Sequence, residues 1–305
     1  MRITIVPAGP KTSAATIRQL LNKAPASVDV YGVYRSIYKV PAEFLSHKNF
    51  HAVCGDIEDA SSLDLSGSDA VMTSTPPFFS GEDPFAKTEE VSNNVKGAVE
   101  RAGGIKRLML LSSMGAEFAE GVGEIKTNHI AEKVFRSTNV PELLFVRCGY
   151  FMENWTMFNL QTLRGSDPYL NSLITPIDFQ LPMVAVEDIG STFATGLLSS
   201  YAPPSKPYVF ALHGPKEYSP NDVQAAFSEA MGKQIPLKAI EKDQLADFFS
   251  TFIPPNLVGT WVEMSCSFLP GGVAAPGSDG IENVDIVRGK VELGKAIKDA
   301  VEAGI

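Results

Sequence analysis

The chain has 305 residues, a length that suits one large folded domain or two smaller ones. Its 44% apolar and 20% charged residues exclude intrinsic disorder, which needs fewer apolar side chains and more charge. The formal net charge of −9, without any run of basic residues, argues against a nucleic-acid partner.

Cysteine and histidine usage predicts neither disulfides nor a metal site. The three cysteines are odd in number and widely spaced, and His47, His51 and His213 are scattered along the chain. No apolar stretch approaches the roughly 20 residues that span a bilayer, and the first residues resemble a strand rather than a signal peptide. We therefore expect a cytoplasmic protein with no membrane partner.

Short apolar runs alternate with helical patterns through the first half, which is typical of βαβ units and a parallel sheet. Val91, Val95 and Val99 recur every four residues and predict a helix over 87–102, and a second helix is expected over 128–137. Together these elements predict a Rossmann-type, doubly wound parallel sheet over residues 1–150. The expected strands are 3–6, 28–34, 51–54, 70–73, 107–112 and 143–147.

Strand patterns become rare and prolines frequent after residue 150. A strand over 184–186 leads into a helix with Asp188 near its first turn, and Ser219 starts another helix that Gly232 ends. Residues 270–280 predict a surface loop, and 289–303 a terminal helix. We expect 151–305 to form a smaller α/β substrate-binding lobe, packed closely enough to count with the first part as one domain.

Three blocks of residues resemble the NmrA-like family of atypical short-chain dehydrogenases, relatives of the isoflavone reductases. Leu111–Ala116 is similar to the family's fifth strand and following loop, and Gly123–Glu132 to its next helix entry. Arg147–Asn154 resembles the family's Arg-Pro-Gly-x-Phe-Met-Glu-Asn block, with Cys148 in the proline's place. The resemblance covers nearly the whole chain. It implies a dinucleotide cofactor and an oxidoreductase activity, as in secondary metabolism.

The phosphate-binding loop departs from that family's Gly-x-x-Gly-x-x-Gly pattern, because Pro7, Pro10 and Ser13 occupy the glycine positions. Proline fixes φ and deletes an amide donor, although it is tolerated in a first helical turn. The remaining candidates for cofactor contact in this loop are Gly9, Lys11 and Thr12, at the start of the first helix. The alternative is a strand–helix turn that no longer binds a ligand.

Residues after three further strands are also candidates for cofactor binding. Arg35 ends the second strand, where arginine suits the 2′-phosphate of NADP; a solvated surface arginine is the alternative. Asp56 and Ile57, after the third strand, resemble the family's adenine contact, and a simple turn is the alternative. Ser74 and Thr75 follow the fourth strand at the carboxyl edge, where open α/β sheets bind ligands. NADP is therefore the expected cofactor.

The Tyr-x-x-x-Lys pair, the proton relay of typical short-chain dehydrogenases, is missing after the fifth strand. In its place we predict His129 as a catalytic acid or base, oriented by Glu132 one turn later. A histidine at a helix start and a surface glutamate are the alternative. Lys126 and Tyr150 are further catalytic candidates.

Aromatic residues after the sixth strand predict a pocket wall for a flat or hydrophobic small-molecule substrate. Core packing is the alternative for Phe151, whereas Asn154 is less easily assigned to packing. The proposed substrate-binding residues are Ser113, Met114, Phe151, Asn154 and Trp155, with Met157, Phe158 and Trp261 as extensions of the apolar set.

Three functions remain open. The first is an NADP-dependent reductase acting on a small hydrophobic or aromatic carbonyl, imine or enone. The second is a cofactor-independent isomerase, cyclase or lyase, favoured by the altered loop and the missing Tyr-x-x-x-Lys pair. The third is a non-catalytic redox sensor that binds a dinucleotide. Formation of a homodimer is left open.

Overall fold

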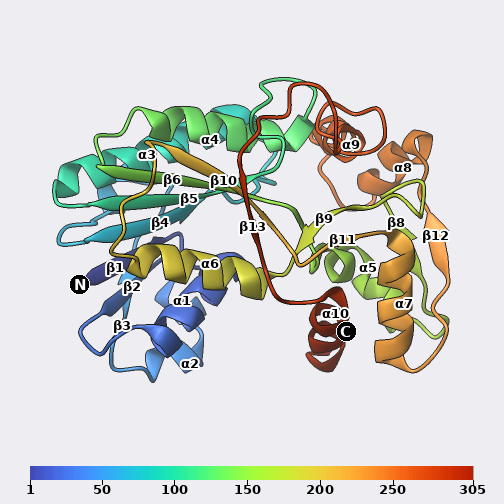
Figure 1. The fold of residues 1–305 in the computed structure, drawn as a ribbon, viewed down its shortest axis with the longest axis horizontal. Coiled ribbons are helices and arrows are strands. Elements are labelled where there is room, and N and C mark those ends of the chain that lie inside the picture. Colours follow the sequence, from blue (N-terminus) through green and yellow to red (C-terminus); the bar gives the residue numbers. More distant parts are fainter. Residues whose placement is uncertain (305) are drawn as a thin grey trace.

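The structure, a computed structural model, describes residues 1–304. Its main sheet has eight parallel strands in the order β13-β10-β6-β5-β4-β1-β2-β3 (Figure 1). The six strands expected from the sequence are confirmed, and together they have the order of a Rossmann sheet. Two further strands, β10 and β13, come from the second half and were not expected. The bounds are β1 Arg2–Val6, β2 Asp29–Tyr34, β3 Phe50–Cys54, β4 Ala70–Ser74, β5 Arg107–Ser113, β6 Glu142–Cys148, β10 Tyr208–His213 and β13 Asp285–Arg288.

Helices cover both faces of this sheet, which is why its strands are apolar on both sides. Figure 1 shows α1 (Lys11–Lys23) and α6 (Val186–Leu198) below the sheet, and α3 (Pro84–Ala102) and α4 (Lys126–Arg136) above it. Helices α1 and α6 pack so closely that a Cβ added at Gly190 of α6 would lie 2.6 Å from the backbone of Ala15 of α1. Both of these layers are continuous apolar cores.

The second lobe has its own apolar core and two small sheets. Strands β7 (Tyr150–Phe151), β9 (Leu181–Val184) and β11 (Glu217–Tyr218) form one, and β8 (Leu170–Ser172) and β12 (Leu237–Ala239) the other. Its helices are α5 Asn154–Arg164, α7 Pro220–Met231, α8 Leu245–Ser250, α9 Val258–Ser267 and α10 Leu293–Glu302. Shorter helical turns are η1 Ile37–Lys39, α2 Ala42–Leu45, η2 Ala60–Ser62, η3 Gly123–Ile125 and η4 Lys242–Gln244. Within residues 1–304, no helix combines the length and the apolar character needed to cross a membrane.

Local signals in this lobe act as the sequence predicts. Helix α7 starts with a capping box, in which the Asp222 carboxylate accepts the Ser219 amide at 2.8 Å, and Gly232 ends it with φ +64°. The predicted loop over 270–280 contains neither helix nor strand. The terminal helix begins later than predicted, at Leu293, because β13 and its exit turn occupy the preceding residues.

The second half of the chain returns to the main sheet as α6, β10 and β13 (Figure 1). Asp188, in the first turn of α6 as predicted, holds the segment that leaves β13, the last strand to join the main sheet. Its Oδ2 accepts the backbone amides of Lys290 at 3.0 Å and Val291 at 2.8 Å. Gly289 lies directly against this carboxylate, where a Cβ would collide with it. The two halves are therefore interleaved at the sheet.

A buried ion network ties the upper layer together. Arg147 of β6 is 3% exposed, and its Nε and Nη2 donate to the two carboxylate oxygens of Glu132 of α4 at 2.9 and 2.8 Å. Ser112 of β5 donates to the same carboxylate at 2.7 Å. The remaining Nη1 pairs with Glu282 at 2.7 Å and Glu117 at 3.3 Å, so the loops before α4 and β13 are joined to the same guanidinium.

Glu132→Ala is expected to lower the free energy of unfolding by about 3–5 kcal/mol, because Arg147 would remain buried without its bidentate partner. Urea denaturation followed by circular dichroism measures the change. The matched control is Glu100→Ala, which removes a partly exposed i,i+4 pair with Lys96 on α3 and should cost less than about 1 kcal/mol. An equally small loss for Glu132→Ala would contradict this view of the network.

Candidate functional site

A cavity of about 480 Å³ lies at the carboxyl edge of the main sheet, where the second lobe covers it. This is the edge at which open α/β sheets bind ligands. Its floor consists of the segments that follow the central strands, and its roof comes from α5, α8 and α9. The floor residues are Pro10–Thr12 after β1, Ser74–Pro77 after β4, Leu111–Met114 at the end of β5 and Cys148–Phe151 at the end of β6.

The start of helix α1 presents free amides to this cavity. Pro10 lies immediately before the helix, and the first helical hydrogen bond runs from the Ala14 amide to the Pro10 carbonyl at 2.9 Å. The amides of residues 11–13 therefore precede the helical ladder, as in anion-binding helix starts. Pro10 precedes these amides in the chain, so it removes none of the donors. A Cβ at Gly9 would meet nothing within 4 Å, so the loop also leaves open space beside its backbone.

Two hydroxyls at the end of β4 lack protein partners. The Oγ of Ser74 and the Oγ1 of Thr75 are buried and line the cavity, yet neither makes a hydrogen bond within residues 1–304. A buried polar atom without a partner is costly, and a bound ligand would satisfy it. These hydroxyls and the amides of α1 therefore fit the phosphate and sugar groups of a dinucleotide.

The other predicted cofactor residues lie outside the cavity, at the ends of β2 and β3. The Arg35 side chain is 72% exposed, and its Nη1 is 3.9 Å from Glu58 Oε1. The Asp56 carboxylate accepts the amide of Glu58 at 3.1 Å, and Ile57 is buried. Arg35 is thus free to move toward a ligand, whereas Asp56 shapes the turn in which it lies.

Aromatic rings gather along one part of the cavity wall. Trp261 packs against Phe249 at 5.7 Å and Phe158 at 6.3 Å between ring centroids, and Tyr150 against Phe268 at 6.0 Å. The predicted residues Ser113, Met114, Phe151, Asn154, Met157, Phe158 and Trp261 all line the cavity.

Trp155 is the exception among the predicted substrate residues. It is buried in the core of the second lobe and is not part of the cavity lining. It follows Asn154 directly on α5, so its side chain points to a different side of the helix. Phe249 and Phe268 also line the cavity and were not predicted from the sequence, because they do not follow a strand of the main sheet.

Only one of the three predicted catalytic residues lines the cavity. Tyr150 lines the cavity, whereas Lys126 and His129 do not. Lys126 pairs with Glu120 at 2.7 Å, and His129 Nδ1 is 2.9 Å from the Ala116 carbonyl.

The prediction that Glu132 orients His129 is wrong. Both carboxylate oxygens of Glu132 are taken by Arg147, which is buried beside it and offers a charged bidentate partner. The α4 residue that does line the cavity is Asn128, one helical turn before Glu132 and on the same side of the helix. The sequence analysis missed it.

Lys11, Cys148, Tyr150 and Glu153 are the lining residues with titratable side chains. Burial raises the pKa of the Cys148 thiol and of the Tyr150 phenol well above their usual ranges, and contact with Asn154 opposes the shift of Tyr150 only in part. Both groups therefore stay protonated at neutral pH. Burial also raises the pKa of Glu153, while its hydrogen bond from the Val186 amide lowers it.

The family model described as NmrA-like family matches residues 1–301. The chain belongs to the NmrA-like family. None of the curated proteins compared with it matches.

Solved structures show the same fold as this NmrA-like chain at low sequence identity. Triphenylmethane reductase from Citrobacter sp. has a TM-score of 0.73 at 17% identity, over 99% of this chain and 100% of that chain. The NADPH-dependent quinone oxidoreductase of Escherichia coli has 0.70 at 16%, over 99% and 100%. NmrA, a negative transcriptional regulator, in complex with NAD has 0.71 at 18%, over 99% and 95%.

Helix α9, which carries Trp261, rests on the turn η3 in this NmrA-like chain. The contact is so close that a Cβ added at Gly123 would collide with the carbonyl of Thr260. The Glu124 carboxylate is buried in this contact, with the Thr260 hydroxyl at 3.5 Å. Burial raises the pKa of Glu124 to about 7.

Glu124→Gln should make stability less dependent on pH. The folded-state pKa of about 7 lies above the ordinary 4.5, so the native chain loses stability as the pH rises from 4.5 through 7. The glutamine variant avoids that loss. It should gain up to about 3 kcal/mol over the native chain by about pH 8, and nothing near pH 4.

Urea denaturation at both pH values measures this difference. Glu263→Gln, on the exposed side of the same helix α9, is the matched control and should follow the native chain throughout. Parallel behaviour of the Glu124 and Glu263 variants would contradict the raised pKa.

Proposed function

We propose that this chain is an NADPH-dependent reductase of the atypical short-chain dehydrogenase type, acting on a small, flat, hydrophobic or aromatic carbonyl, imine or enone. One observation carries the proposal: a single cavity is lined by the start of α1, by the unpaired hydroxyls after β4 and by a set of aromatic rings. The helix start and the hydroxyls suit a dinucleotide, and the rings suit a planar substrate.

The residues present fit the cofactor in spite of the altered loop. The amides of Lys11 and Thr12 hold the pyrophosphate, and the hydroxyls of Ser74 and Thr75 hold the adjoining sugar groups. Arg35 carries the 2′-phosphate, which gives the preference for NADP over NAD. When bound, the cofactor supplies a hydride to the substrate.

The remaining cavity residues bind and orient the substrate. The rings of Phe158, Phe249 and Trp261 exclude water, which strengthens every polar contact inside the cavity. The carboxamides of Asn128 and Asn154 fix the polar atom of the substrate, because they donate and accept hydrogen bonds without titrating.

Proteins with the same fold support a nicotinamide cofactor. Triphenylmethane reductase is found complexed with NADP(H), the quinone oxidoreductase with NADPH, and NmrA with NAD. By their names, the first two act on triphenylmethane dyes and on quinones, in keeping with the aromatic side chains that line this cavity. The third is a regulator, which keeps a dinucleotide sensor as an alternative.

A cofactor-independent isomerase, cyclase or lyase is the second candidate. The observation that favours it is the absence of a tyrosine–lysine pair on α4, where Asn128 faces the cavity instead. Such an enzyme would act through Tyr150, Glu153 and the carboxamides alone. It would turn over its substrate when shown to carry no nucleotide.

Arg35→Ala should weaken NADPH binding about ten- to a hundredfold, because it removes a charge-assisted contact worth roughly 1.5–3 kcal/mol. NADH binding should barely change, since NADH lacks the 2′-phosphate. Calorimetry or the fluorescence of the bound nicotinamide measures both affinities.

Arg18→Ala is the matched control, because Arg18 is also partly exposed but is held by Glu43 of α2 and does not follow a strand of the main sheet. It should leave both affinities unchanged. If the native chain fails to bind NADPH, or turns over a substrate without any nucleotide, the reductase assignment is wrong.

A further inference from the structure

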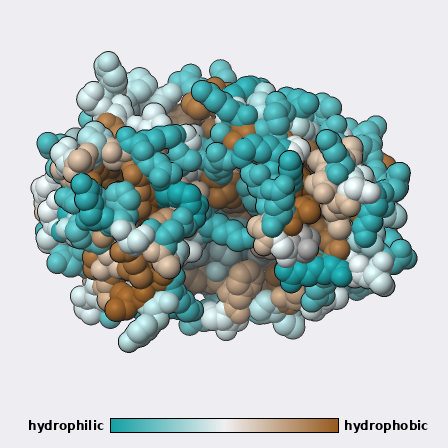
Figure 2. Space-filling model, turned by 90° about the horizontal axis from the view of Figure 1, so that it is seen from below, coloured by the Kyte–Doolittle hydropathy of each residue, from teal (hydrophilic) through white to brown (hydrophobic). Residues whose placement is uncertain are grey.

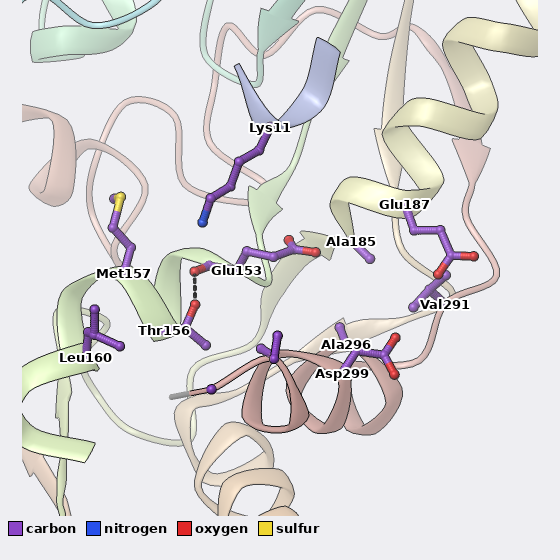
Figure 3. Close-up of a pocket in the computed structure, with 13 residues that line it drawn as sticks. Lys11, Glu153, Thr156, Met157, Leu160, Ala185, Glu187, Val291, Ala296 and Asp299 are labelled. Atoms are coloured by element: carbon purple, nitrogen blue, oxygen red, sulfur yellow. Dashed lines mark hydrogen bonds between the residues drawn. The ribbon is translucent and has the colours of Figure 1, made fainter. Parts of the chain in front are cut away.

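Two hollows meet at the side chain of Glu153. One is the cavity of the proposed site, and the other is a groove of about 500 Å³ between α5, the start of α6 and α10 (Figure 3). Lys11, Glu153 and Met157 line both, so they form the wall between them. Met157 is 55% exposed, which shows that the groove is open to solvent.

The groove lies among both apolar and charged groups. Figure 2 shows, on the face seen from below, hydrophobic side chains in hollows between hydrophilic ones. Besides Glu153, two carboxylates line the groove, those of Glu187 and Asp299, and Lys295 pairs with them at 2.8 and 2.7 Å. Met157 and the pair of Lys295 with Glu187 are exposed, so water can reach the groove side of the Glu153 wall.

Glu153 has one occupied and one free carboxyl oxygen. Its Oε1 accepts the Val186 amide at 2.9 Å, whereas Oε2 is buried and makes no hydrogen bond within residues 1–304. Val186 is the first residue of α6, so its amide brings the positive end of the helix dipole to the carboxyl. In Figure 3 the carboxyl group extends toward Ala185, and the Lys11 side chain enters from the opposite side.

Both charge states of Glu153 are supported by its surroundings. Burial, the largest influence, favours the acid and raises its pKa, and the charge of Asp188 on α6 acts in the same direction. The Val186 amide and the charge of Lys11 on α1 favour the carboxylate. A carboxyl group held between these influences can give up a proton and take it back.

The other titratable groups of the cavity are poorer proton donors. Burial holds the pKa of Tyr150 and of Cys148 well above their usual ranges, so their anions are too unfavourable to form readily. Lys126 and His129 do not line the cavity. Glu153 is the lining carboxyl group, and like Lys11 it also lines the groove.

We propose that Glu153 is the proton donor of this site and that the groove returns its proton from solvent. The inference rests on the proposed function, because the substrate carbon receives its hydride from NADPH. As that C–H bond forms, the π electron pair of the carbonyl, imine or enone takes the proton from Glu153 Oε2. The carboxyl O–H bond breaks and leaves a carboxylate facing the Val186 amide. One water-borne proton from the groove then restores the acid.

Infrared difference spectroscopy of the whole chain, titrated from about pH 5 to pH 9, tests the proton directly. We expect the C=O band of a protonated carboxyl group that disappears as the pH rises through this range and is absent from Glu153→Gln. Glu124→Gln is the matched control, since it removes the other buried carboxyl group with a raised pKa and should keep the Glu153 band.

Turnover with NADPH tests the role. Menadione, a quinone, needs a proton with each hydride, whereas a triphenylmethane dye cation becomes neutral on receiving the hydride alone. Glu153→Gln should lower kcat for menadione at least about a hundredfold, leave NADPH affinity unchanged and leave the dye rate unchanged. Glu153→Asp should recover part of the menadione rate and its pH dependence.

Four results separate the proton-donor assignment from the proposed function. If the Glu153 band is absent throughout the titration, or if Glu153→Gln reduces menadione at the native rate, the proton-donor assignment is overturned. An equal loss of rate with menadione and with the dye would also overturn it, because it would show a structural role. If the native chain does not bind NADPH, the proposed function fails instead, and the infrared titration still decides whether Glu153 holds a titrating proton.

Discussion

The architecture depends on one buried guanidinium. Placing a charge in a protein interior is costly unless partners surround it, and Arg147 has its partners, Glu117, Glu132 and Glu282, on three separate segments of the chain. Glu132 brings α4 against the sheet, and the same carboxylate accepts Ser112 from β5. The residues next to Arg147 and Ser112 in sequence, Cys148 and Ser113, line the cavity. The network that organises the core therefore also fixes the strand ends on which the site is built.

The joint between the lobes is the second constraint on the site. Glycine follows β6 because the backbone of β9 lies directly over it: a Cβ at Gly149 would be 2.7 Å from the Pro182 carbonyl oxygen. Gly214, after β10, lies equally close to Met183, and its amide donates to the Met183 carbonyl at 2.7 Å. These close approaches hold β9 of the second lobe against the ends of β6 and β10. The shape of the site therefore depends on how the second lobe packs on the main sheet.

The first six strands could be predicted because each is a short apolar run buried on both faces, and topology then brings their carboxyl ends together. That is why Ser74, Thr75, Ser113 and Tyr150 were found from the sequence. Strand β13 could not be found, since all four of its residues are exposed and carry no apolar pattern. For Asn128, the missing knowledge was which side of α4 faces the sheet, and this depends on Arg147 from a distant strand.

The interleaving of the two halves has a consequence for how the chain comes to be folded. As the chain leaves the ribosome, the six Rossmann strands emerge first, but Arg147 meets Glu282 only after 135 further residues, and β13 completes the sheet edge later still. The nascent sheet exposes its β6 edge until β10 emerges, and then its β10 edge until β13 emerges. Such long-range closure slows folding and leaves an unpaired strand edge open to other chains. While the last quarter of this protein is being synthesised, the open strand edge can therefore pair with other chains. Chaperone protection of the emerging sheet would matter most at this stage.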